Sequence, residues 1–419
     1  MSRRTRPARA VQALGLVATF ALVLAGCGTS ESSSNTSLTG EVRMLANISP
    51  ALTKQYYEGL VAPFVQAHPG VKVTIESPSG KDVQSTLQQE LASGSTPDVV
   101  ASNLDPVVAP QMAPFPDEQW VKDTPLAGST AIDGNTWQVA TGTQIQSVVF
   151  YNKDAFTKAG ITAPPTSLAD FTTALTKLKA AGYVPLQTAG EWVTGAQFAM
   201  AANPDLLGED ASWYLDRNAK KVKFADSAYS KYLDAYAGWI KDDLVPKDSL
   251  GEKYQDSIDN FVAGKSGMFI MGNWLVSTLD TAKPTFEAGA FPTPTLDGSA
   301  PKQLSGMAQP YSILKASKNQ NLARELVKYL VSDQTAIAAS LKSEGNFRKG
   351  VTYDGSPLTK EVAAILDKSP GAVNGTSGPG INSGFGNQLN TVVQSLYTGQ
   401  SASQAAAELD TWWDANAVQ

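Results

Sequence analysis

The sequence predicts an α/β fold of two domains, each built on a mostly parallel sheet flanked by helices. Between 41 and 100, stretches with strand patterns alternate with stretches of helical periodicity, an order that implies parallel strands and right-handed crossovers. About 380 residues follow the amino-terminal segments, which is enough for two domains. A third observation is the short apolar run 268–271, which has the pattern of a buried strand and ends in a glycine ahead of Trp274.

The amino-terminal segment 1–26 has the pattern of a secretory signal peptide. Arginines precede an uncharged apolar run, 13–26, that is too short to span a membrane comfortably. The run ends Leu-Ala-Gly before Cys27, the only cysteine, and this ending matches the bacterial lipobox. We therefore expect a lipid on Cys27 that anchors the protein to the outer face of the cell membrane. Residues 27–40 are rich in serine and threonine, so we expect a disordered tether there.

Charge and composition argue against several classes of function. Removal of the signal peptide takes four arginines and no acids from a chain of formal charge -6, which leaves -10. An acidic chain without a basic run argues against nucleic-acid partners. The single histidine, His68, precedes Pro-Gly in a predicted turn, so we expect no metal, no cofactor and no histidine-dependent catalysis. Catalysis by paired carboxylates stays open, because Asp and Glu are frequent.

The first part of the folded chain justifies the prediction of parallel strands. Its expected strands and helices alternate at 41–46, 52–67, 71–75, 82–91 and 97–100. The helix at 82–91 is expected to end at Gly94. Because the carboxyl ends of parallel strands meet at one edge of a sheet, we expect Asn47 and the segment 102–105 to face the same rim.

The middle of the chain contains clear turn and capping signals. Asp-Gly within 132–137 predicts a hairpin turn, 138–146 alternates weakly, and 147–151 has the pattern of a buried strand. Asn152 and Ser167 are expected to cap helices that end near 159 and 181. A short strand at 185–187 precedes a loop that carries Glu191 and Trp192.

The last part is mainly helical. Prolines within 291–294 exclude a central strand there, whereas 306–314 has strand character. A turn-rich connector is expected at 344–350 and a Gly/Ser/Asn-rich stretch at 371–386. Helices are expected at 229–242, 257–262, 321–331, 335–341, 359–367, 389–397 and 402–412.

Trp274 is the main candidate for a ligand contact. A large aromatic residue behind a glycine, at the carboxyl end of a strand, occupies the place where open α/β sheets bind ligands. The alternative is that Trp274 packs beneath a loop. The remaining tryptophans, apart from Trp192, are expected to be structural, and Asp98 is expected to be a structural acid at a strand end.

Several motifs resemble the extracellular solute-binding proteins of ABC importers, in the large family that includes the maltose-binding proteins. They are F-x-x-G-K-x-x-M-x-I-x-G-x-W at 261–274, YNKDAFTKAG at 151–160 with Pro-Pro-Thr at 164–166, the helix 323–333, and GNFRK at 345–349. The resemblance implies a two-lobed periplasmic-binding-protein fold with a hinge of several crossing segments. One lobe would comprise 41–148 and 304–349, and the other 149–303 and 350–419.

The resemblance also implies a binding protein rather than an enzyme. It would be a monomer that captures a sugar between its lobes and delivers it to an ABC permease. By position, the implied ligand contacts are Asn47, Asn103, Asp105, Gln144, Glu191, Trp192, Trp274 and Phe385. Trp192 has the alternative of anchoring its loop.

The sequence departs from the maltose-binding branch at three places. Ser102 and Gly386 stand where that branch has aromatic residues, and Gln144 or Gln146 occupies a region where a carboxylate is common. The resemblance therefore does not imply maltose itself. Two alternatives stay open: a binding protein for a polyamine or similar small cation, and a secreted carbohydrate-active enzyme with two carboxylates about 5–10 Å apart.

Overall fold

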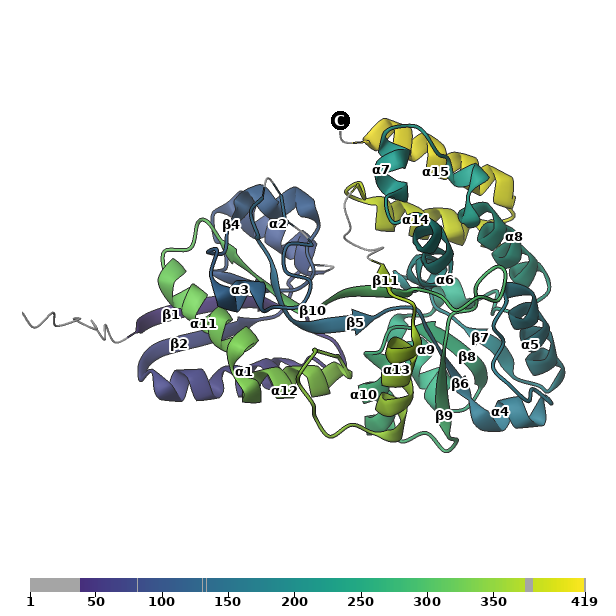
Figure 1. Ribbon diagram of the computed structural model, residues 1–419, viewed down its shortest axis with the longest axis horizontal. Helices are drawn as coiled ribbons and strands as arrows, with labels where there is room; N and C mark the ends of the chain where they lie inside the picture. The colour runs from purple at the N-terminus through teal and green to yellow at the C-terminus, as the bar shows by residue number, and fades with distance from the viewer. Residues whose placement is uncertain (1–37, 81, 130, 133, 374–379, 418–419) are drawn as a thin grey trace, which may run out of the picture. The chain divides into compact units, whose positions relative to one another are not determined.

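The computed structural model describes residues 38–419, apart from 81, 130, 133, 374–379 and 418–419 (Figure 1). The expected signal peptide, Cys27 and most of the expected tether lie outside the described residues. The end of the tether was predicted wrongly. Thr39 and Gly40 belong to β1 (Thr39–Ala46), because their backbones pair with those of Gly70 and Val71 in the next strand.

The first sheet is mixed rather than mostly parallel, as Figure 1 shows. β1 runs parallel to both of its neighbours, whereas β10 runs antiparallel to β3, β4 and β5. A strand that returns from far along the chain carries no signal of its direction, so the sequence patterns did not reveal this. The strands are β1, β2 (Gly70–Glu76), β3 (Val99–Ala101), β4 (Met112–Ala113), β5 (Val139–Ile145), β10 (Gln303–Leu314) and β11 (Ala372–Val373).

Helices cover both faces of this sheet and form the first lobe. The helical segments are α1 (Lys54–Ala67), α2 (Val83–Ser93), η1 (Pro106–Gln111), α3 (Gln119–Lys122), α11 (Gln320–Ser332) and α12 (Gln334–Glu344). Leu60 of α1 and Leu326 of α11 share one hydrophobic cluster, while Leu87 of α2 and Val108 of η1 share another. The prediction that α2 ends at Gly94 is confirmed. Gly94 has the left-handed conformation that glycine adopts without strain.

The second sheet has the strand order β7-β8-β6-β9. Its strands are β6 (Val148–Asn152), β7 (Val184–Gln187), β8 (Ser266–Met271) and β9 (Ala288–Pro292). All residues of β8 are buried, as the apolar run predicts. β9 is an edge strand that ends at Pro292, which confirms that the proline-rich segment is not central.

The helices around the second sheet form the second lobe. They are α4 (Lys153–Lys158), α5 (Leu168–Ala180), α6 (Val193–Glu209), α7 (Trp213–Asn218), η2 (Phe224–Asp226), α8 (Ala228–Lys241), η3 (Ser249–Gly251), α9 (Tyr254–Val262), α10 (Leu275–Ala282), α13 (Pro357–Lys368), α14 (Phe385–Ser395), η4 (Leu396–Thr398) and α15 (Ala402–Asn416). The sequence analysis missed α6 and α7. Most of α6 is buried, so it has no polar face and no one-sided periodicity to detect.

An aromatic core joins α6, α7, α8, α14 and α15. Tyr214 stacks on Trp413 with ring centroids 5.4 Å apart, and the buried Arg217 pairs with Asp410 and Asp414 at 3.1 and 2.8 Å. Four of the tryptophans expected to be structural are buried: Trp137, Trp213, Trp239 and Trp413. Asp98 is also structural, because its carboxylate accepts a hydrogen bond from the backbone N–H of Arg43 at 2.9 Å.

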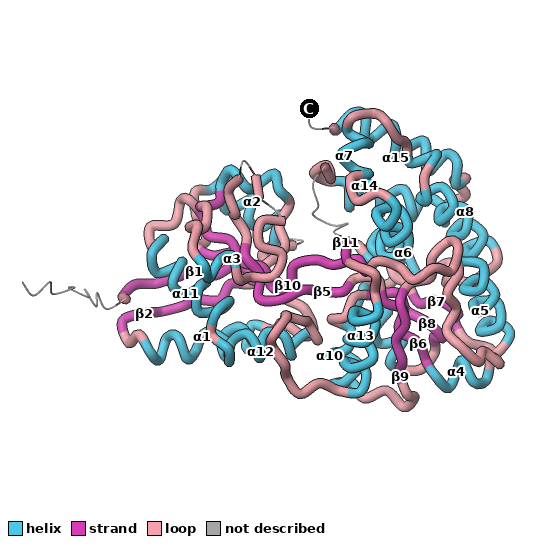
Figure 2. The backbone as a smooth tube through the Cα atoms, in the orientation of Figure 1, coloured by secondary structure: helices cyan, strands magenta, loops and turns pink. Residues whose placement is uncertain are grey.

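Three segments connect the lobes. Figure 2 shows the paired strands β5 and β10 running from the first sheet toward the second. The third segment, 345–356, follows α12 and leads to α13. Asn273, at the end of β8, ties two of these segments together. Its buried side chain accepts a hydrogen bond from the N–H of Ile145 at 2.6 Å and donates to the carbonyls of Glu344 and Gly345 at 3.1 and 2.8 Å.

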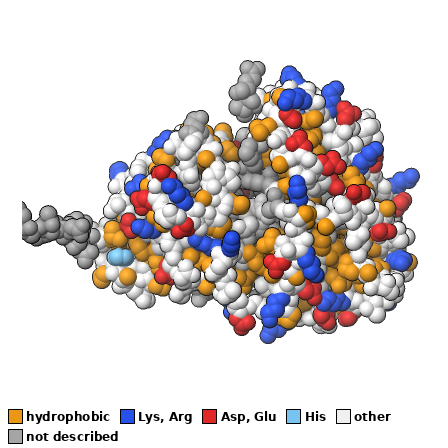
Figure 3. Space-filling model, viewed as in Figure 1, with side chains coloured by type: hydrophobic (Ala, Val, Ile, Leu, Met, Phe, Trp, Pro, Cys, Tyr) orange, Lys and Arg blue, Asp and Glu red, His pale blue; other side chains and the backbone are white. Residues whose placement is uncertain are grey.

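In the part of the chain that the structure describes, no helix combines the length and the apolar character needed to cross a membrane. On the face shown in Figure 3, basic and acidic side chains are interspersed and form no large patch of one sign. This distribution accords with the absence of a basic run in the sequence.

Candidate functional site

Three aromatic side chains meet at the carboxyl edge of the second sheet. We call Trp192, Tyr254 and Trp274 the aromatic set. The ring centroids of Trp192 and Tyr254 lie 4.8 Å apart, and the indole N–H of Trp274 donates to the Tyr254 hydroxyl at 3.1 Å. Trp192 is 42% exposed, whereas Tyr254 and Trp274 are partly buried. The set therefore offers solvent an aromatic surface whose members hold one another in place.

Trp274 lies at this position because it follows the end of β8. The strand ends at Met271, and the indole folds back over Gly272, where an added Cβ would lie 2.0 Å from a ring carbon. Only glycine permits this close approach. Trp274 also packs against the hydrophobic clusters on both sides of the second sheet. It thus combines partial packing in the core with a place in the aromatic set.

The loop that carries Trp192 is held from two directions. The carboxylate of Glu191 accepts a hydrogen bond from the backbone N–H of Tyr254 at 3.0 Å. The carbonyl of Glu191 accepts from the side chains of Asn390 and Gln394 on α14, and Asn390 also accepts from the N–H of Gly195 at 2.9 Å. Glu191 itself has a positive φ of 51°. These contacts indicate that Glu191 positions the aromatic set.

Tyr254 is the site residue that the sequence analysis missed. It is the first residue of α9, a helix that the sequence pattern placed at 257–262. An aromatic residue next to a predicted helix is a weak signal, because most such residues pack into cores. Only its contacts with Trp192 and Trp274 distinguish it.

The polar candidates of the first lobe lie where the sequence analysis expected a rim. The N–H of Asn47 donates to the carbonyl of Ala101 at 3.0 Å, which confirms that the ends of β1 and β3 are adjacent. The side-chain amide of Asn103 donates to the carbonyl of Met307 on β10 at 3.4 Å. The exposed side chain of Asn47 and the amide of Asn103 supply polar groups at this edge.

Asp105 connects the two lobes. One carboxylate oxygen caps η1 by accepting from the N–H of Val107 at 2.9 Å. The other accepts from the hydroxyl of Ser383 at 2.8 Å and from the N–H of Gly384 at 3.3 Å, just ahead of α14. Asp105 therefore lies where the first lobe meets the second.

The connecting strands contribute glutamine side chains. Gln144 on β5 pairs with Gly306 on β10, and Gln146 follows β5 directly. Gln146 is 7% exposed, and among the described residues its side-chain oxygen has no hydrogen-bond partner. An added Cβ on Gly306 would lie 2.7 Å from the Gln146 amide nitrogen, so glycine leaves room for this side chain. A buried acceptor without a hydrogen-bond partner carries a free-energy cost.

Phe385, which the resemblance implied as a ligand contact, is buried in this structure, and its burial gives that expectation no support. The side chain is 4% exposed and packs among Tyr214, Phe224, Trp412 and Trp413. The resemblance alone implied a ligand contact here, whereas the first turn of the amphipathic helix α14 directs Phe385 into the aromatic core.

The acidic candidates of the site are engaged in local hydrogen bonds. The carboxylates of Asp105 and Glu191 both accept hydrogen bonds from backbone N–H groups, so they hold loops in place. Among the described residues, no group of three or more histidine, cysteine, aspartate or glutamate side chains could hold a metal ion. The exposed aromatic surface is the most distinctive chemical feature of the site.

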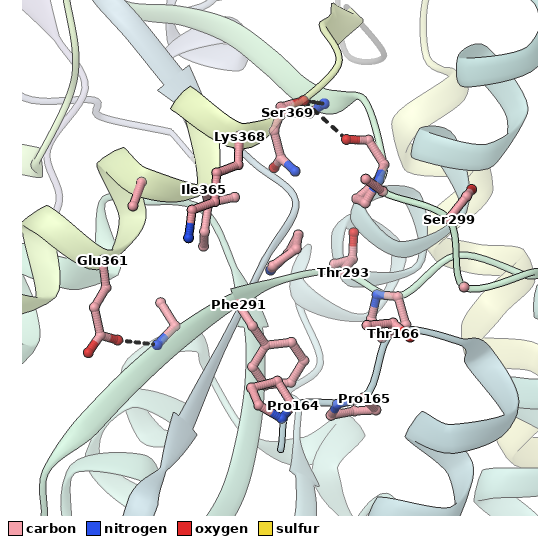
Figure 4. A pocket seen from close by; sticks show the side chains of 18 of the residues that line it. Pro164, Pro165, Thr166, Phe291, Thr293, Ser299, Glu361, Ile365, Lys368 and Ser369 are labelled. Atoms are coloured by element: carbon pink, nitrogen blue, oxygen red, sulfur yellow. Dashed lines mark hydrogen bonds between the residues drawn. The ribbon is translucent and has the colours of Figure 1, made fainter.

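A separate cavity of about 510 Å³ lies on the second lobe between β9, α13 and the loop 164–166 (Figure 4). Its walls are rich in proline, and Phe291 forms part of them. Glu361 lies at one side of it and accepts from the N–H of Ala290 at 3.0 Å. No predicted site residue lines this cavity, so it is distinct from the site around the aromatic set.

Comparisons with known proteins accord with this architecture. Residues 50–337 match the model of the family of bacterial extracellular solute-binding proteins. The diacetylchitobiose binding protein DasA of Streptomyces coelicolor is 25% identical over 377 residues, which span 82% of this chain and 83% of DasA. The chain belongs to the family of bacterial extracellular solute-binding proteins.

Solved structures show the same fold. The solute-binding protein RafE in complex with raffinose superposes with a TM-score of 0.75 at 17% identity, covering 90% of this chain and 99% of RafE. A chitin oligosaccharide binding protein superposes with a TM-score of 0.76 at 20% identity and with the same coverage. A manno-oligosaccharide-specific solute-binding protein of Bifidobacterium animalis superposes with a TM-score of 0.73 at 19% identity, covering 90% of this chain and 94% of the other. The two-lobed solute-binding fold, with helices flanking each sheet, is therefore established for this chain.

Proposed function

We propose that this protein captures a sugar or a short oligosaccharide between its two lobes and delivers it to the permease of an ABC importer. The observation that carries the proposal is the aromatic set, because Trp192 presents an exposed indole face supported by Tyr254 and Trp274. The pyranose ring presents C–H faces that stack on such surfaces. The names of similar proteins, which refer to diacetylchitobiose, raffinose and manno-oligosaccharides, support a carbohydrate ligand.

Polar groups on the first lobe complement the aromatic surface. Asn47 and Asn103 would bind sugar hydroxyls from the first lobe, and Gln144 and Gln146 would add polar groups from the connecting strands. A micromolar affinity corresponds to about -8 kcal/mol. Net hydrogen bonds of about 1 kcal/mol each would not reach this value easily, so burial of the aromatic set has to supply a large part of it.

Capture requires a hinge, and we place it in the three connecting segments. The rigid bodies would comprise 41–148 with 304–349, and 149–303 with 350–419. Solute contacts from both lobes are satisfied together only when the lobes approach, so the solute favours the closed form by its differential affinity. Asp105 and Ser383 mark a point where the lobes touch on closure.

The protein would act as a monomeric binding protein without catalytic activity, anchored outside the cell through a lipid on Cys27. The lipobox pattern supports the anchor. The engagement of Asp105 and Glu191 with backbone N–H groups weighs against a pair of free catalytic carboxylates. The same engagement weighs against a polyamine ligand, because the ammonium groups of a polyamine need carboxylates that are not already paired.

A thermal-shift screen of the full chain tests the proposal. The probes are diacetylchitobiose, raffinose and mannotriose, with spermidine and glycerol phosphate as non-sugar comparisons. We expect an oligosaccharide to raise the melting temperature, because binding to the native state stabilises it. A shift with spermidine alone would overturn the carbohydrate assignment. Chromatography of the oligosaccharides after incubation with the chain checks for cleavage, which a binding protein would not produce.

A further inference from the structure

Glu344 is a buried acid that the proposed site does not use. It is the last residue of α12, is 6% exposed and stands at the start of the third connecting segment. Its carboxylate accepts a hydrogen bond from the side-chain amide of Asn346 at 3.2 Å. Among the described residues, no lysine or arginine forms an ion pair with Glu344. A carboxyl group in such a place is most stable when it is neutral.

Glu344 interacts electrostatically with four tyrosines. Tyr56 and Tyr57 belong to α1, Tyr311 to β10, and Tyr254 to the start of α9 in the second lobe. Burial, and to a smaller extent the charge of Glu344, raises the pKa of each of these four tyrosines. All four are therefore neutral near pH 7, and none of them compensates a negative charge on Glu344.

Two amides complete this environment. Gln309 on β10 faces the carboxyl, while the amide of Gln309 donates to the carbonyl of Ser340 and the hydroxyl of Ser343 at 3.0 and 2.8 Å. Burial raises the pKa of Glu344 to about 7, although hydrogen bonds from Asn346 and Gln309 act in the opposite direction. Proton exchange at this group thus falls within the ordinary working range of pH.

Glu344 is linked directly to the hinge and to the site. Asn273 donates to the carbonyl of Glu344 and to the side-chain oxygen of Asn346 at 3.1 and 2.8 Å, and it also holds the end of β5. Tyr254, whose pKa is raised mainly by burial and to a smaller extent by the charge of Glu344, belongs to the aromatic set. Asn346 thus joins the Glu344 carboxylate to Asn273 of the second lobe, so the surroundings of this carboxyl depend on how the lobes are arranged.

We propose that Glu344 is a positioning residue that couples closure of the two lobes to the binding of one proton. A neutral Glu344 favours the arrangement in which its carboxyl is buried and bonded to Asn346. An ionised Glu344 favours an arrangement in which water reaches the carboxylate, because a buried charge without a partner is costly. This inference rests on the proposed function in one respect, namely that closure of the lobes is the movement that captures the solute.

Small-angle scattering of the ligand-free full chain between pH 5.5 and pH 8.5 tests the coupling without any sugar. We expect the radius of gyration to increase with pH in the wild type and to be independent of pH in Glu344→Gln, which is neutral and nearly isosteric. Glu90→Gln is the matched control. Glu90 is another acid whose pKa burial raises, but it lies beside Arg43 in the first lobe. This variant should behave as the wild type does.

Titration calorimetry with diacetylchitobiose, raffinose and mannotriose adds the binding readout. For the probe that binds, we expect the dissociation constant to increase with pH, by at most roughly tenfold per pH unit for one linked proton. The increase should vanish in Glu344→Gln. Identical pH profiles of scattering in the wild type and Glu344→Gln would overturn the inference. Lack of binding by every sugar would instead count against the proposed function, while the scattering result would still decide the role of Glu344.

Discussion

The hydroxyl of Ser383 donates a hydrogen bond at 2.8 Å to the carboxylate of Asp105, and the two residues belong to different lobes. Asp105 is held rigidly on the first lobe because its other oxygen caps η1. Ser383 directly precedes Gly384, the amino-terminal cap of α14 on the second lobe. The contact therefore reports how closely the lobes approach each other, and its removal tests the hinge without altering the aromatic set.

Ser383→Ala should favour the open arrangement of the lobes. A net hydrogen bond contributes about 1 kcal/mol, so we expect the affinity for the bound oligosaccharide to fall roughly fivefold. The melting temperature should change little. Calorimetry measures the affinity, and small-angle scattering measures the arrangement of the lobes. Ser230→Ala, which removes a hydroxyl bonded to the carbonyl of Ser227 within α8, is the control and should leave affinity unchanged. Tighter binding by Ser383→Ala would show that the contact competes with the solute.

Trp192→Ala should weaken sugar binding at least tenfold, or about 1.4 kcal/mol, because it removes the exposed stacking surface. Stability should fall by less than about 1 kcal/mol, since the side chain is 42% exposed. Binding is measured by calorimetry and stability by denaturant unfolding. Trp120→Ala removes a partly buried tryptophan of the first lobe and should leave affinity intact. Unchanged affinity in Trp192→Ala would mean that Trp192 only anchors its loop.

Trp274→Ala should reduce affinity at least tenfold and should also lower stability. Trp274 packs against hydrophobic clusters on both sides of the second sheet, so its truncation leaves a cavity. Tyr254→Phe separates the two effects, because it keeps the ring and removes only the hydroxyl that accepts from Trp274. We expect a twofold to tenfold loss of affinity and a stability change of about 1 kcal/mol for Tyr254→Phe. Loss of folding in Trp274→Ala together with normal binding by Tyr254→Phe would assign Trp274 to the core.

Asn273→Ala should destabilise the chain by about 3 kcal/mol. The substitution leaves the N–H of Ile145 and the carbonyl of Gly345 buried without this partner, and each such group costs about 1–3 kcal/mol. Urea unfolding measures the loss. Asn319→Ala is the comparison. It removes a single exposed hydrogen bond, which Asn319 donates to the carbonyl of Glu41, and it should cost less than about 1 kcal/mol. Equal effects of the two substitutions would contradict the role of Asn273 as the tie between connecting segments.

Stability should decrease as pH rises from 5 to 8, and Glu344 should account for much of the decrease. Its pKa is raised from 4.5 to about 7 on folding, so the native state binds more protons than the unfolded state between these values. The contribution of Glu344 to the free energy of unfolding is fully present below pH 4.5. It is lost as pH rises through 7, which lowers the free energy of unfolding by up to about 3 kcal/mol. Glu344→Gln should flatten this part of the profile, measured by chemical denaturation at each pH. A profile with the same slope in both proteins would contradict the assignment.

Local signals in the sequence predicted many elements well. Asn152 and Ser167 cap α4 and α5 through side-chain oxygens that accept from backbone N–H groups three residues later. Such caps depend on neighbouring residues alone, so a single sequence is sufficient to predict them. The glycine and the apolar run ahead of Trp274 likewise predicted β8 and the end of that strand. The edge position of β9 followed from its proline.

Elements and contacts that depend on distant residues were not predictable in this way. The sequence placed Phe385 in the site, but packing against Tyr214 and Trp413 buries it. The sequence patterns gave no role to the side chain of Asn273, whereas this side chain bonds to residues near 145 and 345. Hydrogen bonds between such remote segments leave no periodic pattern, because neither partner constrains its own neighbours.

By itself, the sequence determined the α/β class, most of the helices and strands, and the placement of Trp192 and Trp274 after strands of a sheet. Those properties follow from hydrophobic periodicity and turn chemistry, which act over a few residues. Only the tertiary structure decided the mixed direction of the sheets, the partnership of Tyr254 with both tryptophans, and the burial of Glu344 at the start of a connecting segment. Each of these depends on which segments come together in space, and that is settled by the burial of apolar surface over the whole chain.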